Sequence, residues 1–385
     1  MSRFKQFLLI FILLINILVG LVYLACSFAP RLHPQEWWFT GFLGLFFPFI
    51  TAAMLLFAVF WLLVKRSWSL FSILVLAIGV STIGLHLPLR TADPFREQKE
   101  EGHLRVMSWN VRHFIPFDES DFKPDRLRQR QQILDQVSRY QPDVICFQEF
   151  ISMPGDEEED PLFQLQHQYG YKYHQFAGED IFGTRQYSGM AIFSRYPIMD
   201  GNALSFPPSF ETNTENPVYA DILFGGDTIR VFSVHLQSFG FGSREYDAID
   251  DIKAEGDNNI RDSKRILRKM RNTFNWHGRQ ADYLSAEIKA SPHPAIVMGD
   301  LNDVPGSYTY AVMRGARQDA FLQRGAGLGA TFTSSSSFIL QLLPTLRIDY
   351  IFHPDRFTTS QFMIGGKRLS DHSFLLADLQ IPRDL

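Results

Sequence analysis

The sequence has 385 residues, a formal net charge of −4 and 46% hydrophobic residues. A net negative charge excludes a protein that holds nucleic acid through broad basic attraction, because such binding depends on an excess of Lys and Arg. Charged residues are scarce before about residue 90 and frequent after it. We therefore expect an apolar N-terminal part followed by a globular domain large enough for a single core.

Apolar stretches without Asp, Glu, Lys or Arg occupy the N-terminal part. They are Phe7–Phe28, Thr40–Leu63 and Leu70–Leu89. Since about 20 apolar residues cross the hydrocarbon core of a bilayer, we predict three transmembrane helices, which form a membrane anchor over residues 1–89. A cleaved signal peptide would explain the first stretch alone, but two more stretches follow it.

Basic residues beside these stretches predict their orientation. Arg3 and Lys5 precede the first stretch, and Lys65 and Arg66 lie between the second and the third. Short flanking segments rich in Lys and Arg tend to stay in the cytoplasm. We therefore expect an integral, multi-pass membrane protein with a cytoplasmic N-terminus and an extracytoplasmic globular domain.

The segment 90–102 is charged and contains Pro94, which is typical of a juxtamembrane linker. We expect the globular domain to cover residues 103–385. Short β-branched or aromatic runs bounded by turn residues predict its strands. They are His103–Val111, Pro142–Phe150, Gly189–Ile198, Thr228–Gln237, Ala295–Asn302 and Arg347–Pro354.

Helical patterns alternate with these strands at Asp125–Tyr140, Arg261–Phe274 and Gly278–Ala290. Strands mixed with helices in this way indicate a layered α/β architecture. The segment Asn259–Phe274 combines an apolar face with many Lys and Arg side chains. It can be a basic helix near anionic headgroups or a polyphosphate, or a docked helix with a solvated basic side.

Polar side chains stand at the ends of most predicted strands. Asn110, Glu149, His235 and the pair Asp300 and Asn302 close four strands, Asp349 lies within another, and Asp371 and His372 precede a final apolar strand. Each has an ordinary explanation by itself, such as a turn or a cap. Together they predict a site for a hard cation such as Mg²⁺, which takes oxygen ligands. Nothing in the pattern indicates a zinc cage, because thiolates are absent from it.

The chain resembles the endonuclease/exonuclease/phosphatase superfamily, which includes deoxyribonuclease I-like and sphingomyelinase-like metal-dependent phosphoesterases. The motifs are WNV (Trp109–Val111), FQE (Phe147–Glu149), VHLQS (Val234–Ser238), GDLN (Gly299–Asn302), RIDYI (Arg347–Ile351) and SDH (Ser370–His372). The resemblance covers about His103 to Ile381. It implies an α/β (α+β) four-layered sandwich, in which two packed mixed, mainly antiparallel β-sheets are flanked by helices and the active site lies at one end.

The resemblance also implies a metal centre. Glu149 matches the principal Mg²⁺ ligand of the family, with Mn²⁺ as an alternative ion, and Asn110 and Asp371 lie near the same metal or its waters. A cation is needed because the negative charge of a phosphodiester repels nucleophiles.

Further residues match the family's proton-handling groups. Asp300 corresponds to the residue that orients and deprotonates the attacking water, and Asn302 to one that holds that water or a phosphoryl oxygen. His372, paired with Asp349, corresponds to the histidine that stabilises charge on the pentacoordinate phosphorus. His235 corresponds to a second histidine that protonates the leaving oxygen, although the sequence leaves open which of the two histidines donates this proton.

These residues predict a membrane-anchored, Mg²⁺-dependent phosphoesterase that hydrolyses phosphodiester bonds by metal-assisted attack of water, in the manner of a nuclease. Because a membrane anchor holds the site near lipids, two alternative activities remain: a phospholipid or sphingomyelin phosphodiesterase, and a phosphatase of a phosphorylated headgroup. A third alternative is an inactive membrane-tethered binding module. The expected partners are a phosphoester substrate, either nucleic acid or phospholipid, and the lipid bilayer; no obligate protein partner is inferred.

Overall fold

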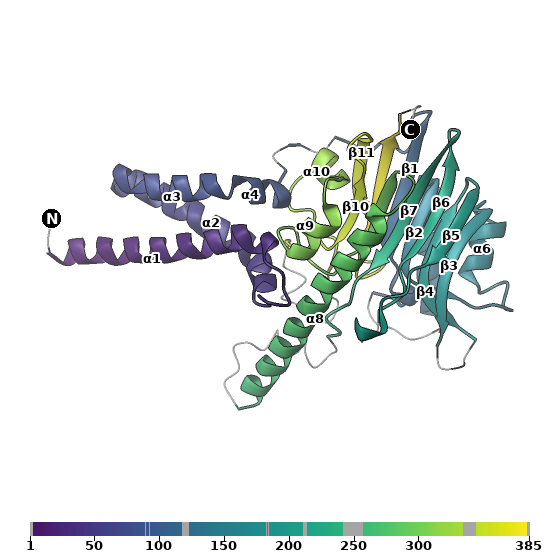
Figure 1. Ribbon diagram of the computed structural model, residues 1–385, viewed down its shortest axis with the longest axis horizontal. Helices are drawn as coiled ribbons and strands as arrows, with labels where there is room; N and C mark the ends of the chain where they lie inside the picture. The colour runs from purple at the N-terminus through teal and green to yellow at the C-terminus, as the bar shows by residue number, and fades with distance from the viewer. Residues whose placement is uncertain are drawn as a thin grey trace.

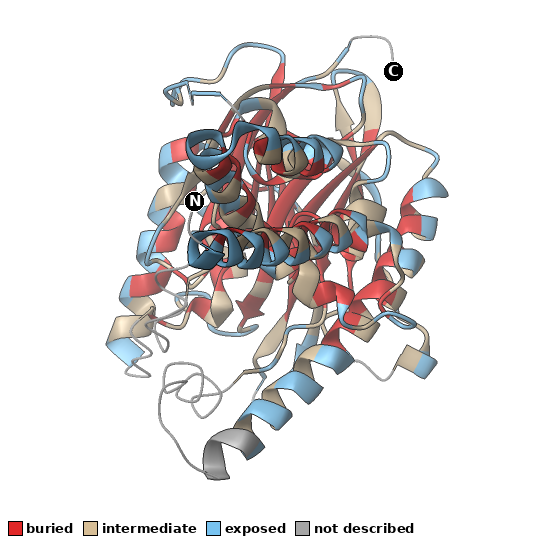
Figure 2. Cartoon of the chain, turned by 90° about the vertical axis from the view of Figure 1, so that its left-hand side faces the viewer, coloured by how far each residue is buried: buried red, intermediate tan, exposed pale blue. Residues whose placement is uncertain are grey.

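The protein is described here by a computed structural model, which covers residues 3–88, 90–91, 93–117, 123–181, 183, 185–210, 214–241, 257–333 and 344–382. Apolar helices extend from one side of a layered α/β domain, and the N-terminus lies at their far end (Figure 1). The strands of this domain are largely buried, whereas the outer faces of the N-terminal helices are exposed (Figure 2).

The N-terminal helices are α1 (Arg3–Phe28), η1 (Ala29–Arg31), α2 (Thr40–Val64), α3 (Arg66–Ile78) and α4 (Val80–His86). Helices α1 and α2 are long and apolar enough to cross a membrane. The third predicted span is divided into α3 and α4, which meet at an angle of 62°. The two helices make a third crossing only if the bent pair acts as one span. The bend falls at Gly79, where an added Cβ would lie 2.3 Å from the Tyr23 hydroxyl of α1.

The globular domain contains two mixed β-sheets of six strands each. One sheet has the order β11 (Thr358–Gly365), β12 (Phe374–Gln380), β1 (His103–Asn110), β2 (Val144–Ser152), β4 (Tyr187–Ser194) and β3 (Tyr173–Asp180). The other has the order β5 (Ile198–Ala203), β6 (Val218–Phe224), β7 (Asp227–His235), β8 (Ala295–Asp300), β10 (Asp349–His353) and β9 (Gln318–Asp319). Within each, one neighbouring pair is parallel, β1 with β2 and β7 with β8, and the rest are antiparallel. The predicted pair of mixed, mainly antiparallel sheets is confirmed.

Helices cover the outer face of each sheet. Helices α5 (Lys123–Tyr140) and α6 (Pro161–His167) pack on the first sheet. Helices α8 (Asp257–Lys289) and α9 (Tyr308–Arg314) pack on the second. The side chains between the two sheets, such as Val106, form the central core. The short elements η2 (Arg112–Phe114), η3 (Pro208–Phe210) and α10 (Ala320–Arg324) complete the domain.

Several of the sequence-based assignments were wrong. The strand predicted over Gly189–Ile198 ends at Ser194, and strands β3, β5, β6, β9 and β11 were not predicted. The patterns predicted as separate helices before and after residue 275 form the single helix α8. Gly278 lies inside this helix, at a point where an added Cβ would be 3.0 Å from Pro34 Cδ in the loop that leads to α2. Glu149 does not close its strand, since β2 continues to Ser152. It sits instead at a β-bulge with φ = 51°, which turns its side chain out of the regular alternation.

The parallel strand pairs bring the polar side chains to one end of the sandwich. The parallel strands β1 and β2 are joined through α5, and β7 and β8 through α8. Parallel strands that are joined by a crossover helix end on the same edge of their sheet. Asn110 ends β1, while His235 and Asp300 end β7 and β8, so these residues approach one another from both sheets.

The N-terminal helices dock on the globular domain through specific contacts. The Phe42 ring meets the Phe274 ring of α8 edge to face with centroids 5.2 Å apart. Arg347 donates from Nη2 to the backbone oxygen of Leu85 at 2.9 Å. The helices therefore form part of the domain surface next to α8 and the start of β10.

Candidate active site

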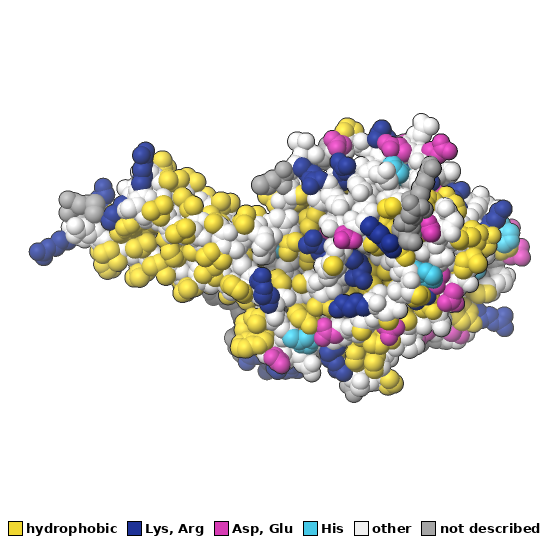
Figure 3. All heavy atoms as spheres, turned by 45° about the horizontal axis from the view of Figure 1, so that its top comes forward, with side chains coloured by type: hydrophobic (Ala, Val, Ile, Leu, Met, Phe, Trp, Pro, Cys, Tyr) yellow, Lys and Arg dark blue, Asp and Glu magenta, His cyan; other side chains and the backbone are white. Residues whose placement is uncertain are grey.

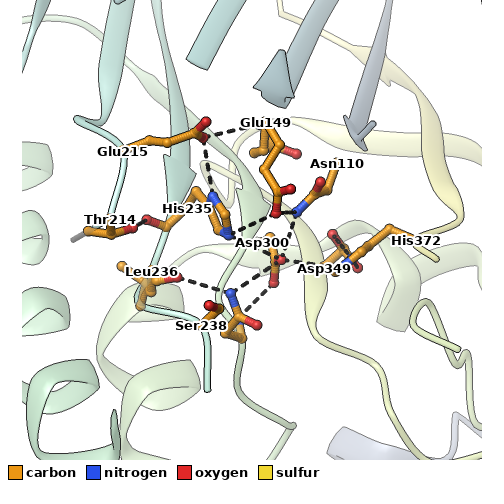
Figure 4. A network of polar contacts seen from close by, with 12 residues as sticks. Asn110, Glu149, Thr214, Glu215, His235, Leu236, Ser238, Asp300, Asp349 and His372 are labelled. Atoms are coloured by element: carbon orange, nitrogen blue, oxygen red, sulfur yellow. Dashed lines mark hydrogen bonds and ion pairs between the residues drawn. The ribbon is translucent and has the colours of Figure 1, made fainter. Parts of the chain in front are cut away.

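Asp300 is the centre of the polar cluster at the end of the sandwich (Figure 4). It is 1% exposed, and its Oδ2 accepts a hydrogen bond from Asn110 Nδ2 at 3.3 Å. His235 Nε2 lies 3.7 Å from the same oxygen, and His372 Nε2 lies 3.6 Å from it. The other oxygen, Oδ1, accepts from the backbone N–H of Asn302 at 2.7 Å. One carboxylate oxygen is thus surrounded by nitrogen atoms from three separate strands and loops.

Glu149 lies beside this centre, and its side chain is 24% exposed. Asn110 Nδ2 donates to Glu149 Oε1 at 3.0 Å, so one carboxamide bridges the carboxylates of Glu149 and Asp300. His235 Nε2 lies 3.9 Å from Glu149 Oε1. His113 approaches from the other side, with Nδ1 3.4 Å from Oε2.

His372 is held by Asp349. Its Nδ1 lies 3.0 Å from Asp349 Oδ2, so the carboxylate fixes the ring with Nε2 pointing toward Asp300. Asp349 starts β10 directly opposite Asp300 in the antiparallel register with β8. Trp109 Nε1 donates to the backbone oxygen of His372 at 3.0 Å, which ties this loop to β1.

Glu215 is a member of the cluster that the sequence analysis missed. It accepts from His235 Nδ1 at 3.2 Å and from the backbone N–H of Glu149 at 3.0 Å. It therefore orients His235 as Asp349 orients His372. Glu215 lies outside any strand, and no pattern around it distinguishes it from a loop carboxylate. His113 was missed for the same reason.

Asn302 and Asp371 lie at the rim of the cluster. The Asn302 carboxamide donates to the backbone oxygen of Leu236 at 3.0 Å, and φ is 49° at this residue, a conformation that Asn tolerates in tight turns. Asp371 Oδ2 lies 3.5 Å from Arg112 Nε. The structure thus brings together all eight side chains that the sequence predicted for the site.

The protonation behaviour follows from burial and from these contacts. Burial raises the pKa of Asp300 to about 6, with Asp349 raising it and His372 opposing the shift. Burial lowers the pKa of His235, but the hydrogen bond to Glu215 and the charges of Asp300 and Glu149 outweigh it and raise the value to about 9.

Glu149 and His372 shift in opposite directions. For Glu149, burial disfavours the charged form, but His235 and His113 outweigh this effect, so its pKa is lowered. Burial disfavours the imidazolium of His372, yet Asp349 and Asp300 raise its pKa well above the ordinary value. The cluster therefore combines cationic imidazoles with an ionised carboxylate and with one carboxyl group that titrates near neutral pH.

Residues 107–372 match the family described as Endonuclease/Exonuclease/phosphatase. The chain belongs to this family. Members of the endonuclease/exonuclease/phosphatase family are phosphoester hydrolases that depend on divalent metals, and the chain is therefore an enzyme of that class. A second match, to a Domain of unknown function (DUF8431), covers residues 7–86 and so coincides with the N-terminal helices. None of the curated proteins compared with the sequence matches it.

Solved structures with a similar chain path include other members of the endonuclease/exonuclease/phosphatase family. One from Beutenbergia cavernae has 19% identity and a TM-score of 0.49, and the match covers 73% of this chain and 72% of that one. A D. rerio TDP2 humanized by 14 mutations has 16% identity and a TM-score of 0.47, with 72% and 99% covered. The human Nocturnin catalytic domain, with bound sulfate, has 17% identity and a TM-score of 0.45, with 75% and 97% covered.

The donor set fits the divalent metal that the endonuclease/exonuclease/phosphatase family requires. Glu149, Asp371 and Asn110 offer oxygen atoms, which hard cations prefer. Burial raises the pKa of Asp371, and the charge of Glu149 contributes to the increase, so these carboxylates lie close enough to repel each other. A cation between them would relieve that repulsion.

A second group, Asp300, Asp349 and His372, has ligand atoms within 4.8 Å of one another and could also hold an ion. However, His372 Nδ1 is already paired with Asp349. That pairing helps to raise the pKa of His372 well above its ordinary value, so the ring is protonated near neutral pH, whereas a histidine must be neutral to bind a metal. This group is therefore better suited to proton handling than to metal binding.

The cluster forms one side of a cavity of about 330 Å³. Polar side chains, including Glu149, Asp300 and His372, line this side. The cavity is large enough for a phosphoryl group and part of its substituents, so a phosphoester can reach the titratable groups.

Proposed function

We propose that this chain is a membrane-anchored, Mg²⁺-dependent phosphoesterase that hydrolyses phosphodiester bonds by attack of water. The observation that carries the proposal is the position of Asp300 Oδ2, which lies 3.7 Å from His235 Nε2 and 3.6 Å from His372 Nε2. A carboxylate with a pKa of about 6 can take a proton from water near neutral pH. Asp300 is therefore the proposed general base.

Glu149, Asn110 and Asp371 are the proposed metal ligands. Bound there, Mg²⁺ would neutralise part of the negative charge on the phosphoryl oxygens. Asn110 also links the ligand set to the base, because its Nδ2 donates to both Glu149 and Asp300. Asn302 is proposed to hold the water or a phosphoryl oxygen.

The two histidines have different proposed roles. His372, charged through its pairing with Asp349, would stabilise the negative charge that develops on the phosphoryl oxygens. His235 Nε2 is buried and has no hydrogen-bond partner among the described residues. Because its pKa is about 9, His235 carries a proton at neutral pH and can give it to the leaving oxygen.

Hydrolysis of bis(p-nitrophenyl) phosphate by the purified full-length protein in detergent tests the proposal. Mg²⁺ should support release of nitrophenolate, and EDTA should abolish it. Asp300→Asn should remove the activity, whereas Asp200→Asn, at a carboxylate with 64% of its side chain exposed, should retain it. Undiminished turnover by Asp300→Asn would disprove the proposed base.

The membrane topology is a separate proposal. Helices α1 and α2 have the length and composition of membrane spans, the bent pair α3 and α4 is the proposed third crossing, and Arg3, Lys5, Lys65 and Arg66 support a cytoplasmic N-terminus. A phosphatase reporter fused to the C-terminus should then be active in the extracytoplasmic compartment. Activity of a cytoplasm-specific reporter at the same position would reverse the orientation.

Two substrate classes are compatible with the proposed reaction, nucleic acids and phospholipids. A nuclease-like diesterase is supported by the activities that give the family its name. A phospholipid diesterase is supported by an observation on this chain, namely the position of α2 beside the cavity.

A further inference from the structure

The lining of the cavity combines polar and apolar side chains. The apolar wall of the cavity consists of side chains from several parts of the chain. They include Leu45, Phe239, Met270, Phe274, Phe332 and Leu346. The reaction itself needs polar groups around the phosphorus, so this apolar wall requires a different explanation. A wall of this kind binds an apolar part of a ligand.

One residue of the wall, Leu45, belongs to α2, which is one of the candidate membrane spans. Tight packing holds α2 in this position. A Cβ on Gly41 would lie 2.4 Å from the Phe274 ring, and a Cβ on Gly44 would lie 3.4 Å from Val304 Cγ2. The absence of a side chain at Gly41 allows α2 to approach α8 closely enough for Leu45 to reach the cavity, and Gly44 leaves room for ordinary contact with Val304.

The same helix exposes apolar side chains on its other faces. Phe46 is 55% exposed and Phe49 is 45% exposed, and both lie within one turn of Leu45. Apolar side chains cover much of the surface of the N-terminal helices (Figure 3). If α2 spans a bilayer, the part of the apolar wall that contains Leu45 adjoins the hydrocarbon region.

The charged residues that line the cavity do not favour a nucleic acid strand. Among the described residues that line it, Arg112 is the one Lys or Arg, and Asp371 lies 3.5 Å from it. The acidic residues Glu149, Asp300 and Asp303 also line the cavity. A polynucleotide needs a cationic groove that follows its backbone on both sides of the reacting phosphate.

We propose that the substrate is a lipid phosphoester from the same membrane, whose hydrocarbon chain lies against the wall formed by Leu45, Met270 and Phe239 while its phosphate reaches Asp300. This inference rests on the proposed function and assigns the substrate class of the same site. The helix α2 is then part of the binding site as well as an anchor. The reaction remains a hydrolysis, in which water forms the new P–O bond, the P–O bond to the leaving alcohol breaks, and His235 supplies the proton to that alcohol.

A series of soluble p-nitrophenyl alkyl phosphodiesters, from methyl to octyl, tests the inference on the full-length protein in detergent. Each carbon that the wall buries should raise kcat/KM by about fourfold until the wall is covered. Leu45→Ala and Met270→Ala should each lower the octyl-to-methyl ratio of kcat/KM by roughly fivefold. A nucleoside diester, thymidine 5′-(p-nitrophenyl phosphate), serves as the competing substrate.

Matched control variants come from the same helices. Leu56→Ala on α2 and Leu267→Ala on α8 change side chains that are 72% and 45% exposed, and neither side chain lines the cavity. Both should retain the wild-type octyl-to-methyl ratio. If the controls change this ratio as much as Leu45→Ala does, the effect comes from the helix and the inference is wrong.

The other outcomes separate the two proposals. Suppose that all alkyl esters are hydrolysed at equal kcat/KM and that His372→Asn abolishes this activity. The lipid inference would then be overturned, and the proposed phosphoesterase function would stand. A higher kcat/KM for the thymidine ester than for the octyl ester would also overturn the lipid inference and favour the nuclease form. No hydrolysis of any diester would overturn the proposed function together with the inference that rests on it.

Discussion

His235 and Asp300 face each other at the ends of two parallel strands. They are paired in register on β7 and β8, and His235 Nε2 lies 3.7 Å from Asp300 Oδ2. Parallel pairing brings both side chains to the same edge of the sheet. The proposed proton donor and proton acceptor of the reaction therefore have positions fixed by a single pair of strands.

This relationship predicts how the reaction responds to the leaving group. His235→Gln removes the proposed acid, so diesters with a poor leaving group, such as phenol, should lose about 100-fold or more in kcat. Diesters that release p-nitrophenolate need little proton donation and should lose much less. Initial rates on methyl phenyl phosphate and methyl p-nitrophenyl phosphate measure the difference. Equal losses on both esters would show that His235 is not the acid.

Glu149→Gln should weaken binding of the metal, because it replaces a charged ligand by a neutral one. We expect the Mg²⁺ concentration for half-maximal activity to rise roughly 100-fold. Binding of Mn²⁺ measured by electron paramagnetic resonance gives a second readout that does not depend on turnover. Glu179→Gln, at an exposed carboxylate on β3, is the control and should leave both values unchanged. Unaltered Mn²⁺ binding by Glu149→Gln would remove Glu149 from the ligand set.

Arg347 should stabilise the contact between the N-terminal helices and the domain. It is 1% exposed, donates to Asp319 Oδ2 at 2.7 Å and donates to the Leu85 backbone oxygen at 2.9 Å. Arg347→Met leaves the buried Asp319 carboxylate uncompensated, which costs about 3 kcal/mol. We expect the thermal midpoint in detergent to fall by roughly 5 °C.

Two variants control this prediction. Adding Asp319→Asn to Arg347→Met removes the unpaired charge and should restore part of the stability. Arg356→Met changes an exposed arginine and should have little effect. A double variant less stable than Arg347→Met would show that the loss does not come from the buried charge.

His353 predicts a dependence of stability on pH. It is buried, with Nδ1 2.9 Å from the Pro354 backbone oxygen and Nε2 2.8 Å from Thr359 Oγ1. Burial lowers the pKa of His353 below its ordinary value, so the unfolded chain binds a proton more readily than the folded chain. The stability that depends on neutral His353 is complete above about pH 6.5 and is lost as the pH falls below that value.

Thermal midpoints from pH 8 to pH 5 check this sign. The wild-type midpoint should fall more steeply on acidification than that of His353→Gln, because the variant has no imidazole to protonate. A variant curve parallel to that of the wild type would show that His353 contributes nothing to the slope.

The sequence determined the strands that carry the site and most of the site residues, because those signals are local. Alternating β-branched and aromatic residues ending in polar groups located Asn110, His235 and Asp300 at strand ends, and the ordered motifs related them to one family. Apolar length alone identified α1 and α2 as candidate membrane spans. Such patterns depend on residues that are neighbours in the chain, so they can be recognised without coordinates.

Tertiary structure decided features that depend on residues far apart in the sequence. Glu215 became the partner of His235 only through a contact between a loop and a strand. Other segments lie close to Gly278 inside α8 and to Gly79 at the bend, and the sequence does not indicate these contacts. Leu45 reached the cavity because α2 packs against α8. Hydrophobic periodicity identifies which faces of a helix are apolar. Packing between distant segments decides which partner covers each face, and this packing formed the apolar wall of the cavity.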